Sequence, residues 1–203
     1  MKLKEGAKRF WYILWKDDSF KGWLLSIVFI FVFIKFIFFP FMSLVTGTAL
    51  PLAIVESCSM YHDGGMFSSV SSWWVGQGDK YSSLNVSLEE FEEFPMKKGF
   101  TKGDILFIVG ADPDKLAVGD IIIFSANQRN PVIHRIIGIA EEDGKRIFST
   151  IGDNNPGQLP FEKSITGDQI VGRAVVQAVP YLGWIKLLFY EGQRPESEGG
   201  FCD

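Results

Sequence analysis

One apolar stretch limits what this chain can fold into more than any other feature. From Trp23 to Val45 the sequence carries a single charge, that of Lys35. As an α-helix rising about 1.5 Å per residue, this stretch is about 34 Å long, enough for the core of a bilayer. We therefore predict a transmembrane helix over residues 23–48, because Gly47 and Pro51 favour an end before Leu50. A cleaved signal peptide would have a shorter apolar region and a small-residue cleavage site.

The flanks of this stretch predict its orientation. Residues 1–22 are rich in lysine, and the positive-inside rule makes them a cytoplasmic basic segment. Everything after the span is then extracytoplasmic. Lys35 costs about 2.5–3.5 kcal/mol at the centre of a spanning helix, so we expect its side chain to snorkel or to face a partner. The span by itself is a generic anchor with no catalytic feature.

The composition of the remainder excludes some classes of partner. A net charge of −4 and a pI near 5.3, with no basic stripe after the early lysines, argue against nucleic acid. Cys58 and Cys202 are too few and too far apart for a metal site or a disulfide framework, and we expect free thiols. The pattern Asn85-Val-Ser87 is a weak N-glycosylation motif that agrees with an extracytoplasmic location. No metal or cofactor is expected.

From Pro51 onward the pattern predicts a mainly β domain over residues 49–190. Short β-branched and aromatic runs, broken by Gly, Asp, Pro and Asn, are typical of an antiparallel sheet or barrel with little helix. The predicted strands are Leu52–Val55, Asp104–Val109, Asp120–Phe124, Val132–Ile139, Arg146–Thr150 and Ile170–Val179. Gly103 and Gly119 are expected to make the turns that lead into two of them.

Three segments of this domain remain open to more than one interpretation. Residues 62–101 form an irregular insertion, either a functional flap or an addition, whose Trp73 and Trp74 suit a membrane surface or the core equally. The run Ala178–Phe189 is too short to span a membrane and is expected to pack on the sheet or lie at the interface. Residues 191–203 are predicted to be a flexible tail.

Several residues suggest nucleophilic catalysis, although each is ordinary by itself. Ser57 and Ser59 share a short turn, and a serine nucleophile needs a base and a group that orients this base. Of the two histidines, His134 lies in a strand-like run, whereas His62 is three residues from Ser59. Asp153, in a Gly-Asp-Asn-Asn turn, is a suitable acceptor for an imidazole N–H.

The order of these motifs is more specific than any one of them. Ser-x-Ser-Met follows the apolar stretch, then come Gly-Asp-Ile-Ile-Ile-Phe, Val-Ile-His-Arg-Ile and Gly-Asp-Asn-Asn. Together they resemble the type I signal peptidases, specifically the archaeal and endoplasmic-reticulum branch, which uses a Ser–His pair. The bacterial branch has a lysine base where this sequence has His134. The resemblance covers about Leu52–Met60 and Gly103–Val176.

This resemblance implies a role for each matching residue. Ser59 is the expected nucleophile, His134 the base, Asp153 the third catalytic residue and Ser57 an oxyanion-hole donor. Many relatives carry a second aspartate about six residues after the first, where this chain has Leu159. The alternatives for the third residue are Glu162, Asp168 or no close carboxylate. We expect Asp153→Ala to lose more activity than Glu162→Ala or Asp168→Ala.

The implied activity is the removal of signal peptides after small residues at −1 and −3, by a membrane-bound serine endopeptidase without cofactor. Its partners would be signal peptides, the lipid bilayer and a secretion translocon, in the cell membrane or the endoplasmic reticulum. The loop Tyr61–Gly65 departs from the family, which has a proline there. Two alternatives follow: an inactive binding or assembly protein on the same fold, or a peptidase dedicated to one surface precursor.

Overall fold

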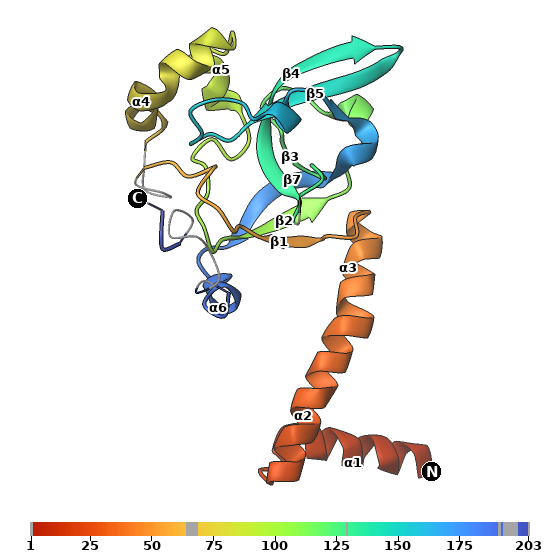
Figure 1. The fold of residues 1–203 in the computed structure, drawn as a ribbon. Helices are drawn as coiled ribbons and strands as arrows, with labels where there is room; N and C mark the ends of the chain where they lie inside the picture. The colour runs from red at the N-terminus through yellow and green to blue at the C-terminus, as the bar shows by residue number, and fades with distance from the viewer. Residues whose placement is uncertain (1, 64–68, 129, 191, 193–198, 203) are drawn as a thin grey trace. The chain divides into compact units, whose positions relative to one another are not determined.

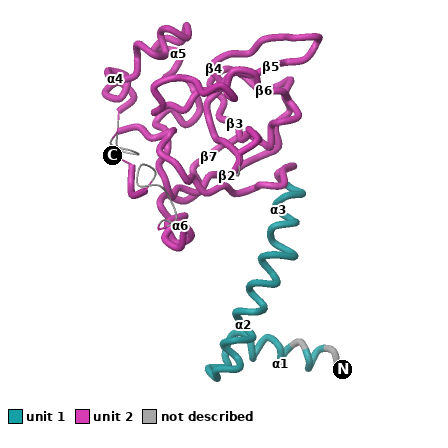
Figure 2. Tube along the Cα trace, in the orientation of Figure 1, with its two compact units in different colours: residues 1–45 teal, residues 46–203 magenta. Residues whose placement is uncertain are grey.

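The computed structural model describes residues 2–63, 69–128, 130–190, 192 and 199–202. The chain divides into two compact units, residues 1–45 and 46–203 (Figure 2).

The first unit is helical and holds the apolar stretch. Its elements are the helices α1 (Lys2–Lys16) and α2 (Phe20–Phe33), the π-helical turn η1 (Ile34–Phe38) and the beginning of α3 (Phe39–Thr46). The Ser19 hydroxyl caps α2 by accepting the Gly22 N–H at 3.1 Å. The π-helical turn ends two residues before Pro40, which has no N–H to continue the α-helical bonding.

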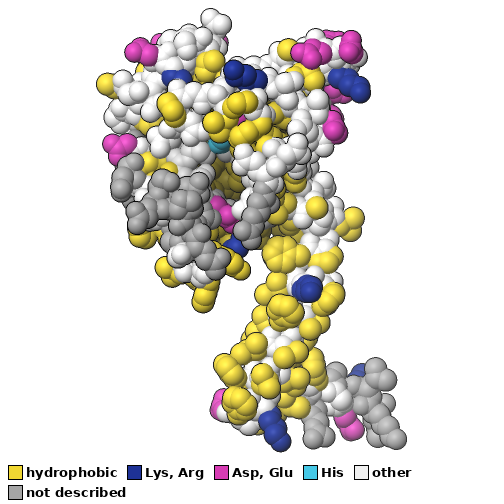
Figure 3. All heavy atoms as spheres, viewed as in Figure 1, with side chains coloured by type: hydrophobic (Ala, Val, Ile, Leu, Met, Phe, Trp, Pro, Cys, Tyr) yellow, Lys and Arg dark blue, Asp and Glu magenta, His cyan; other side chains and the backbone are white. Residues whose placement is uncertain are grey.

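The continuous helix Phe20–Thr46 is a candidate membrane span. It has 27 residues; its most apolar 18-residue stretch has a mean hydropathy of 2.6, and no residue of that stretch is buried, unlike a core helix of a water-soluble domain. In Figure 3, hydrophobic side chains cover this helix along its length. The helix begins three residues before the predicted start at Trp23, because Ser19 is a better N-cap than any residue nearer to Trp23.

The second unit is built on one antiparallel sheet, as predicted. Its strands are β1 (Leu52–Ile54), β2 (Ile105–Val109), β3 (Ile121–Phe124), β4 (Val132–Glu142), β5 (Lys145–Ile151), β6 (Ile165–Thr166) and β7 (Ile170–Val179). The seven strands follow the order β1-β2-β7-β3-β4-β5-β6, and every pairing is antiparallel (Figure 1). The order brings β4 and β5 side by side, and these two strands carry or lead into most of the candidate site residues.

The two glycine turns are confirmed. Gly103 and Gly119 have φ angles of 91° and 94°, a region that glycine enters without steric cost, and each precedes a strand by two residues. The following aspartates cap these turns: Asp104 accepts the Thr101 N–H at 2.7 Å, and Asp120 accepts the Ala117 N–H at 3.0 Å. The turns therefore orient β2 and β3 at their beginnings.

The expectation of little helix is wrong for the insertion. It holds α4 (Val70–Ser83) and α5 (Leu88–Glu93), whose N-caps are the serines 69 and 87. Trp73, Tyr81 and Phe91 of these helices pack with Ile137 and Ile151 of the sheet in one buried cluster. Trp73 is only 6% exposed, so core packing is the correct alternative for this tryptophan. Residues 64–68 lie outside the described part of the chain.

The last described elements are short. The 3₁₀ turns are η3 (Pro113–Lys115), η4 (Pro160–Glu162) and η5 (Gly167–Gln169), and α6 (Trp184–Leu187) follows β7. Leu187 is buried, whereas Ile185, Leu188 and Phe189 are exposed, so one side of this run packs on the domain.

The expectation of two free thiols is also wrong. Cys58 and Cys202 form a disulfide across 144 residues of sequence, with their Cα atoms 5.5 Å apart. A separation this large gives no sign of pairing in the sequence, because the fold alone brings the two positions together. Most of the predicted flexible tail, residues 191 and 193–198 and Asp203, lies outside the described residues, but Cys202 is covalently fixed.

Candidate active site

The serine turn follows β1 and is hydrogen-bonded to the Gly-Asp-Asn-Asn loop. The hydroxyls of Ser57 and Ser59 are 3.1 Å apart. The Asn154 N–H donates to the Ser59 carbonyl at 2.7 Å, and the Asn154 side chain donates to the Cys58 carbonyl at 3.2 Å. The Asp153 N–H contacts the Met60 sulfur at 3.4 Å. Two loops far apart in sequence therefore fix one turn.

His134 connects this turn to a carboxylate. It lies in β4 and is 4% exposed. Its backbone pairs in register with Ile122 of β3, so the imidazole is attached to a rigid strand. Its Nε2 is 2.9 Å from the Ser59 Oγ, and its Nδ1 is 2.5 Å from Glu162 Oε1. A serine hydroxyl, an imidazole and a carboxylate thus form one continuous hydrogen-bonded line.

The carboxylate determines the tautomer of His134. An ionised carboxylate only accepts hydrogen bonds, so Nδ1 of His134 carries the proton that is donated to Glu162. The lone pair of Nε2 is then directed at the Ser59 hydroxyl, which donates to it. This is the arrangement in which a histidine can remove a proton from serine.

Glu162 is the last residue of the 3₁₀ turn η4 and is completely buried. Its Oε2 accepts the Leu159 N–H at 2.7 Å, and its Oε1 also accepts the Thr150 hydroxyl at 3.4 Å. Pro160 suits the first position of such a turn, and a glutamate at its third position commonly bonds back to the preceding N–H. The turn therefore holds the carboxylate in one orientation toward His134.

Asp153 does not lie beside His134, contrary to our expectation. Its Oδ1 accepts Tyr81 Oη at 2.7 Å and Arg135 Nε at 3.0 Å. Its Oδ2 accepts Arg135 Nη2 at 2.7 Å and His62 Nε2 at 2.9 Å. These bonds engage both carboxylate oxygens. Asp153 is thus the centre of a separate buried cluster, which adjoins the serine turn through the contact of its N–H with Met60.

The charge of Arg135 dominates this second cluster. Burial alone would raise the pKa of Asp153, but the Arg135 charge and the hydrogen bonds from His62 and Arg135 lower it well below 3.8. Burial, with the charge of Asp153, raises the pKa of Tyr81. Arg135 also donates to the carbonyl oxygens of Pro95 and Gly119, so it joins the insertion to the sheet.

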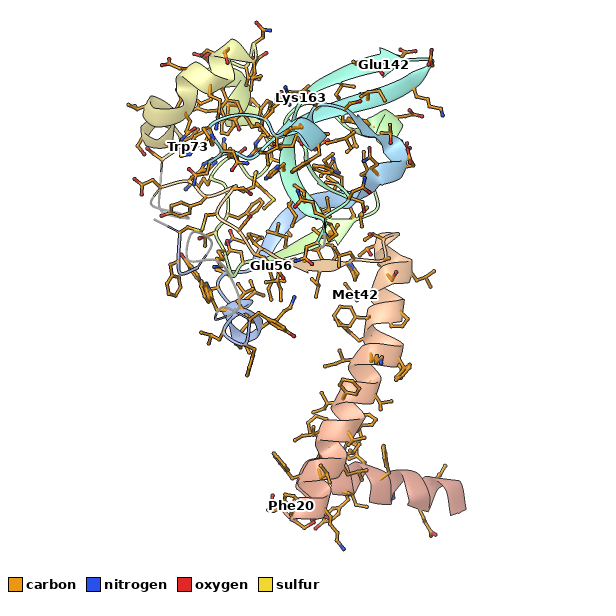
Figure 4. All side chains as sticks on the ribbon, in the orientation of Figure 1. Phe20, Met42, Glu56, Trp73, Glu142 and Lys163 are labelled. Carbon is orange, nitrogen blue, oxygen red and sulfur yellow. A yellow bond between two sulfur atoms is a disulfide. The ribbon has the colours of Figure 1, made fainter. Side chains whose placement is uncertain are left out.

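The helical insertion supports the Gly-Asp-Asn-Asn loop. The Lys80 ammonium of α4 donates to the carbonyl oxygens of Asp153 and Asn155 at 2.6 and 2.9 Å. Burial lowers the pKa of Lys80 to about 8, against the opposing effect of Asp153. Trp73, labelled on α4 in Figure 4, stacks on His62 with the ring centroids 3.7 Å apart. The insertion is thus part of the support for the serine turn.

The other candidate carboxylate is not in the line. Asp168 is exposed on η5, where a hydrogen bond from Thr166 lowers its pKa. Of the loop that departs from the family, Tyr61, His62 and Asp63 are described, and His62 is 1% exposed. Residues 64 and 65 of that loop lie outside the described part of the chain.

Sequence reasoning did not predict the contacts of His62 and Arg135, and it placed Asp153 rather than Glu162 beside His134. Arg135 follows His134 in the same strand, and alternation along a strand directs such neighbours to opposite faces. This pattern indicates that only one of these two side chains can face Ser59 and that the other lies on the opposite face of the strand. The Leu-Pro-Phe-Glu pattern at 159–162 was the available indication of a carboxylate fixed by its own turn.

The chain is similar to known signal peptidase subunits. It is 34% identical over 104 residues to the signal peptidase complex catalytic subunit SEC11C of human. The matched region covers 46% of this chain and 52% of that protein. It is 38% identical over 103 residues to the subunit SEC11 of the yeast Scheffersomyces stipitis, 47% of this chain and 61% of that protein. SEC11 of Lachancea thermotolerans is 30% identical over 112 residues.

These similarities are regional. The chain spans between half and two thirds of the length of the curated relatives that it matches. No protein-family model matches the chain. The fold and the names of these relatives agree with the resemblance recognised in the sequence, which was to the branch with a Ser–His pair.

Proposed function

We propose that this protein is a membrane-anchored serine endopeptidase that removes N-terminal signal peptides from preproteins. The observation that carries the proposal is the hydrogen-bonded line Ser59–His134–Glu162, with distances of 2.9 and 2.5 Å. Such a line activates a serine without a metal or an organic cofactor. The similarity to signal peptidase catalytic subunits supports signal peptides as the substrate class.

In the proposed reaction, the Ser59 hydroxyl attacks the scissile carbonyl while Nε2 of His134 takes its proton. Glu162 holds the imidazole in the required tautomer and stabilises the imidazolium that forms. The imidazolium then donates its proton to the leaving amine, and an acyl-enzyme on Ser59 remains. Water, deprotonated by His134, releases the acyl group and restores the serine.

Ser57 is the proposed oxyanion-hole donor, together with the Ser59 N–H. The Ser57 hydroxyl is 3.1 Å from the Ser59 hydroxyl and is exposed, so it can turn toward a substrate oxygen beside the nucleophile. Loss of one such donor costs about 2.7–4 kcal/mol of barrier. An extended substrate would add to the free edge of β1, which pairs only with β2 within the described sheet. Small residues at −1 and −3 are the expected specificity.

The proposed location is a cell membrane or the endoplasmic-reticulum membrane, with residues 1–22 in the cytoplasm. The Cys58–Cys202 disulfide supports an extracytoplasmic second unit, because disulfides persist mainly in oxidising compartments. The candidate span Phe20–Thr46 supports contact with the lipid bilayer. A signal peptide emerging from a secretion translocon is the proposed substrate.

Replacement of the nucleophile tests the proposal. The full chain in detergent is assayed on a model preprotein, with Ser59→Ala compared with wild type and with Ser83→Ala, a control on the exposed end of α4. Cleavage at the signal-peptide junction by wild type and Ser83→Ala, and none by Ser59→Ala, is the expected result. Activity that survives in Ser59→Ala would exclude Ser59 as nucleophile.

The two alternatives correspond to other outcomes of the same assay. A wild type that cuts nothing would indicate a binding or assembly protein on this fold. A wild type that cuts one surface precursor but no general preprotein would indicate a dedicated peptidase. The intact line from Ser59 to Glu162 favours an active enzyme over the first alternative.

A further inference from the structure

The disulfide of this protein lies within the serine turn itself. Cys58 is placed between Ser57 and Ser59, and its sulfur is bonded to Cys202 across 144 residues of sequence. The backbone of Cys58 is directly continuous with the two residues that carry the hydroxyls. Any displacement of Cys58 therefore moves Ser57 or Ser59.

A second contact joins the C-terminal part of the chain to the serine turn. Lys186 of α6 forms an ion pair with Glu56 at 3.1 Å, one residue before Ser57; Glu56 is labelled in Figure 4. The α6 helix is in turn fixed to the domain, because the Trp184 indole N–H donates to the Lys102 carbonyl at 3.0 Å. Half-exposed ion pairs contribute little energy, so this contact alone would not hold the turn.

A third contact connects Cys202 with α6. The ring of Phe201 packs on the indole of Trp184, with centroids 4.4 Å apart. We use the name latch segment for α6 (Trp184–Leu187) together with Phe201 and Cys202. The latch segment thus contacts the residue before Ser57 through an ion pair and the residue after it through a covalent bond.

The remaining bonds of Cys58 are hydrogen bonds at its carbonyl oxygen. This oxygen accepts the Tyr61 N–H at 3.1 Å and the Asn154 side-chain N–H at 3.2 Å. A hydrogen bond at a partly exposed site contributes about 0.5–1.5 kcal/mol net, so such bonds open readily. The disulfide is the one covalent restraint between this turn and a distant part of the described chain.

We propose that the Cys58–Cys202 disulfide is a redox-sensitive positioning crosslink that keeps the Ser59 hydroxyl aligned with His134. The proposal rests on the proposed function of Ser59. A dithiol reductant opens the bond by thiol–disulfide exchange: two electrons pass to the protein, which gains two cysteine thiols, and the reductant becomes a cyclic disulfide. A displacement of about 1 Å at a reacting group can cost about 100-fold in rate.

The test compares oxidised and reduced full-length protein in detergent. The substrate probe is a fluorogenic peptide with alanine at −1 and −3, and non-reducing peptide mapping verifies the disulfide. Dithiothreitol is expected to lower kcat about 10-fold with KM changed less than twofold, since binding along β1 does not depend on the crosslink. Cys202→Ser, which leaves the serine turn unaltered in sequence, is expected to have the kcat of the reduced enzyme. Dithiothreitol is expected not to change the kcat of this variant.

Hydrogen exchange at the Tyr61 amide gives a readout that is independent of catalysis. This amide bonds to the Cys58 carbonyl, and its exchange is expected to become faster on reduction and in Cys202→Ser. If the wild type does not cut the peptide, the proposed function fails, whereas the exchange measurement still decides the crosslink. All assays run below the onset of unfolding of each variant, because loss of a disulfide also lowers stability.

Three results would overturn the positioning role. The first is two free thiols in protein prepared without reductant. The second is wild-type Tyr61 exchange in Cys202→Ser, accompanied by wild-type kcat where the enzyme cuts the peptide. The third is a rise in kcat on reduction, which would make the latch segment an obstruction of the site.

Discussion

Two buried carboxylate–histidine pairs lie in the second unit, and only one of them contacts a serine. Glu162–His134 and Asp153–His62 each combine a fully buried carboxylate with a histidine whose side chain is at most 5% exposed. In each pair one ring nitrogen donates to the carboxylate, which leaves the other with a lone pair. The histidines of the two pairs therefore differ only in what surrounds the ring nitrogen that does not bond to the carboxylate.

The surroundings of that second nitrogen separate the two pairs. In His134 it is 2.9 Å from the Ser59 hydroxyl. In His62 it has no hydrogen-bond partner among the described residues, and the ring is covered by Trp73. Asp153 also neutralises Arg135, whereas Glu162 has no cationic partner among the contacts described. A histidine beside a carboxylate becomes a base only where its free nitrogen has a proton to take.

The largest expected effect is the loss of the proposed base. His134→Gln should lower kcat about 10⁴-fold, because general-base removal of the Ser59 proton is lost. The matched substitution His62→Gln should change kcat per folded molecule less than 10-fold, since His62 contacts no reacting group. Peptide hydrolysis by both variants checks this. A larger loss in His62→Gln would reverse the assignment of the two pairs.

The next effect concerns the carboxylate beside His134. Glu162→Gln should lower kcat about 10³-fold, because an amide can donate to Nδ1 and favour the wrong tautomer of His134. Asp168→Asn, on the exposed turn η5, serves as the control and should keep wild-type activity. This ranking replaces the one expected from the sequence, in which Asp153 was the leading carboxylate. Equal losses in Glu162→Gln and Asp168→Asn would contradict it.

Asp153 should act mainly on stability. Asp153→Asn leaves the buried charge of Arg135 without its counter-ion, which should reduce the free energy of unfolding by about 3 kcal/mol. Urea unfolding of the full chain in detergent, followed by near-ultraviolet circular dichroism, measures this change. Glu162→Gln is the comparison and should lose less, because it leaves no unpaired cation. A stability loss in Glu162→Gln as large as in Asp153→Asn would remove the distinction.

The smallest effect is a pH dependence of stability at acid pH. The folded pKa of Asp153 lies below its ordinary value of 3.8, so its stabilising contribution is present above 3.8 and is lost as the pH falls through the folded pKa. Between these values the unfolded state binds one more proton, which gives a slope of at most about 1.4 kcal/mol per pH unit. Asp153→Asn should have a shallower slope than wild type over about pH 2.5–3.5. Equal slopes would contradict the lowered pKa.

The sequence by itself determined the elements whose pattern is local. The apolar run predicts the helix that ends at Thr46, and alternating or continuous β-branched runs predict six of the seven strands. The missing strand, β6, has two residues and too little pattern to recognise. His134 was predicted to face Ser59, because both belong to short motifs whose order is distinctive. Local periodicity and chain order are sufficient for such features.

Only the tertiary structure decided which groups meet across the fold. Glu162 reaches His134, and Asp153 reaches Arg135 and His62, because the loop after β5 turns Asp153 toward the insertion while η4 returns to β4. The disulfide likewise joins positions 144 residues apart. A carboxylate two residues beyond a strand has the same sequence pattern whether it bonds to the histidine beside the serine or to a buried arginine. Its partner is set by packing at a distance, which no local pattern contains.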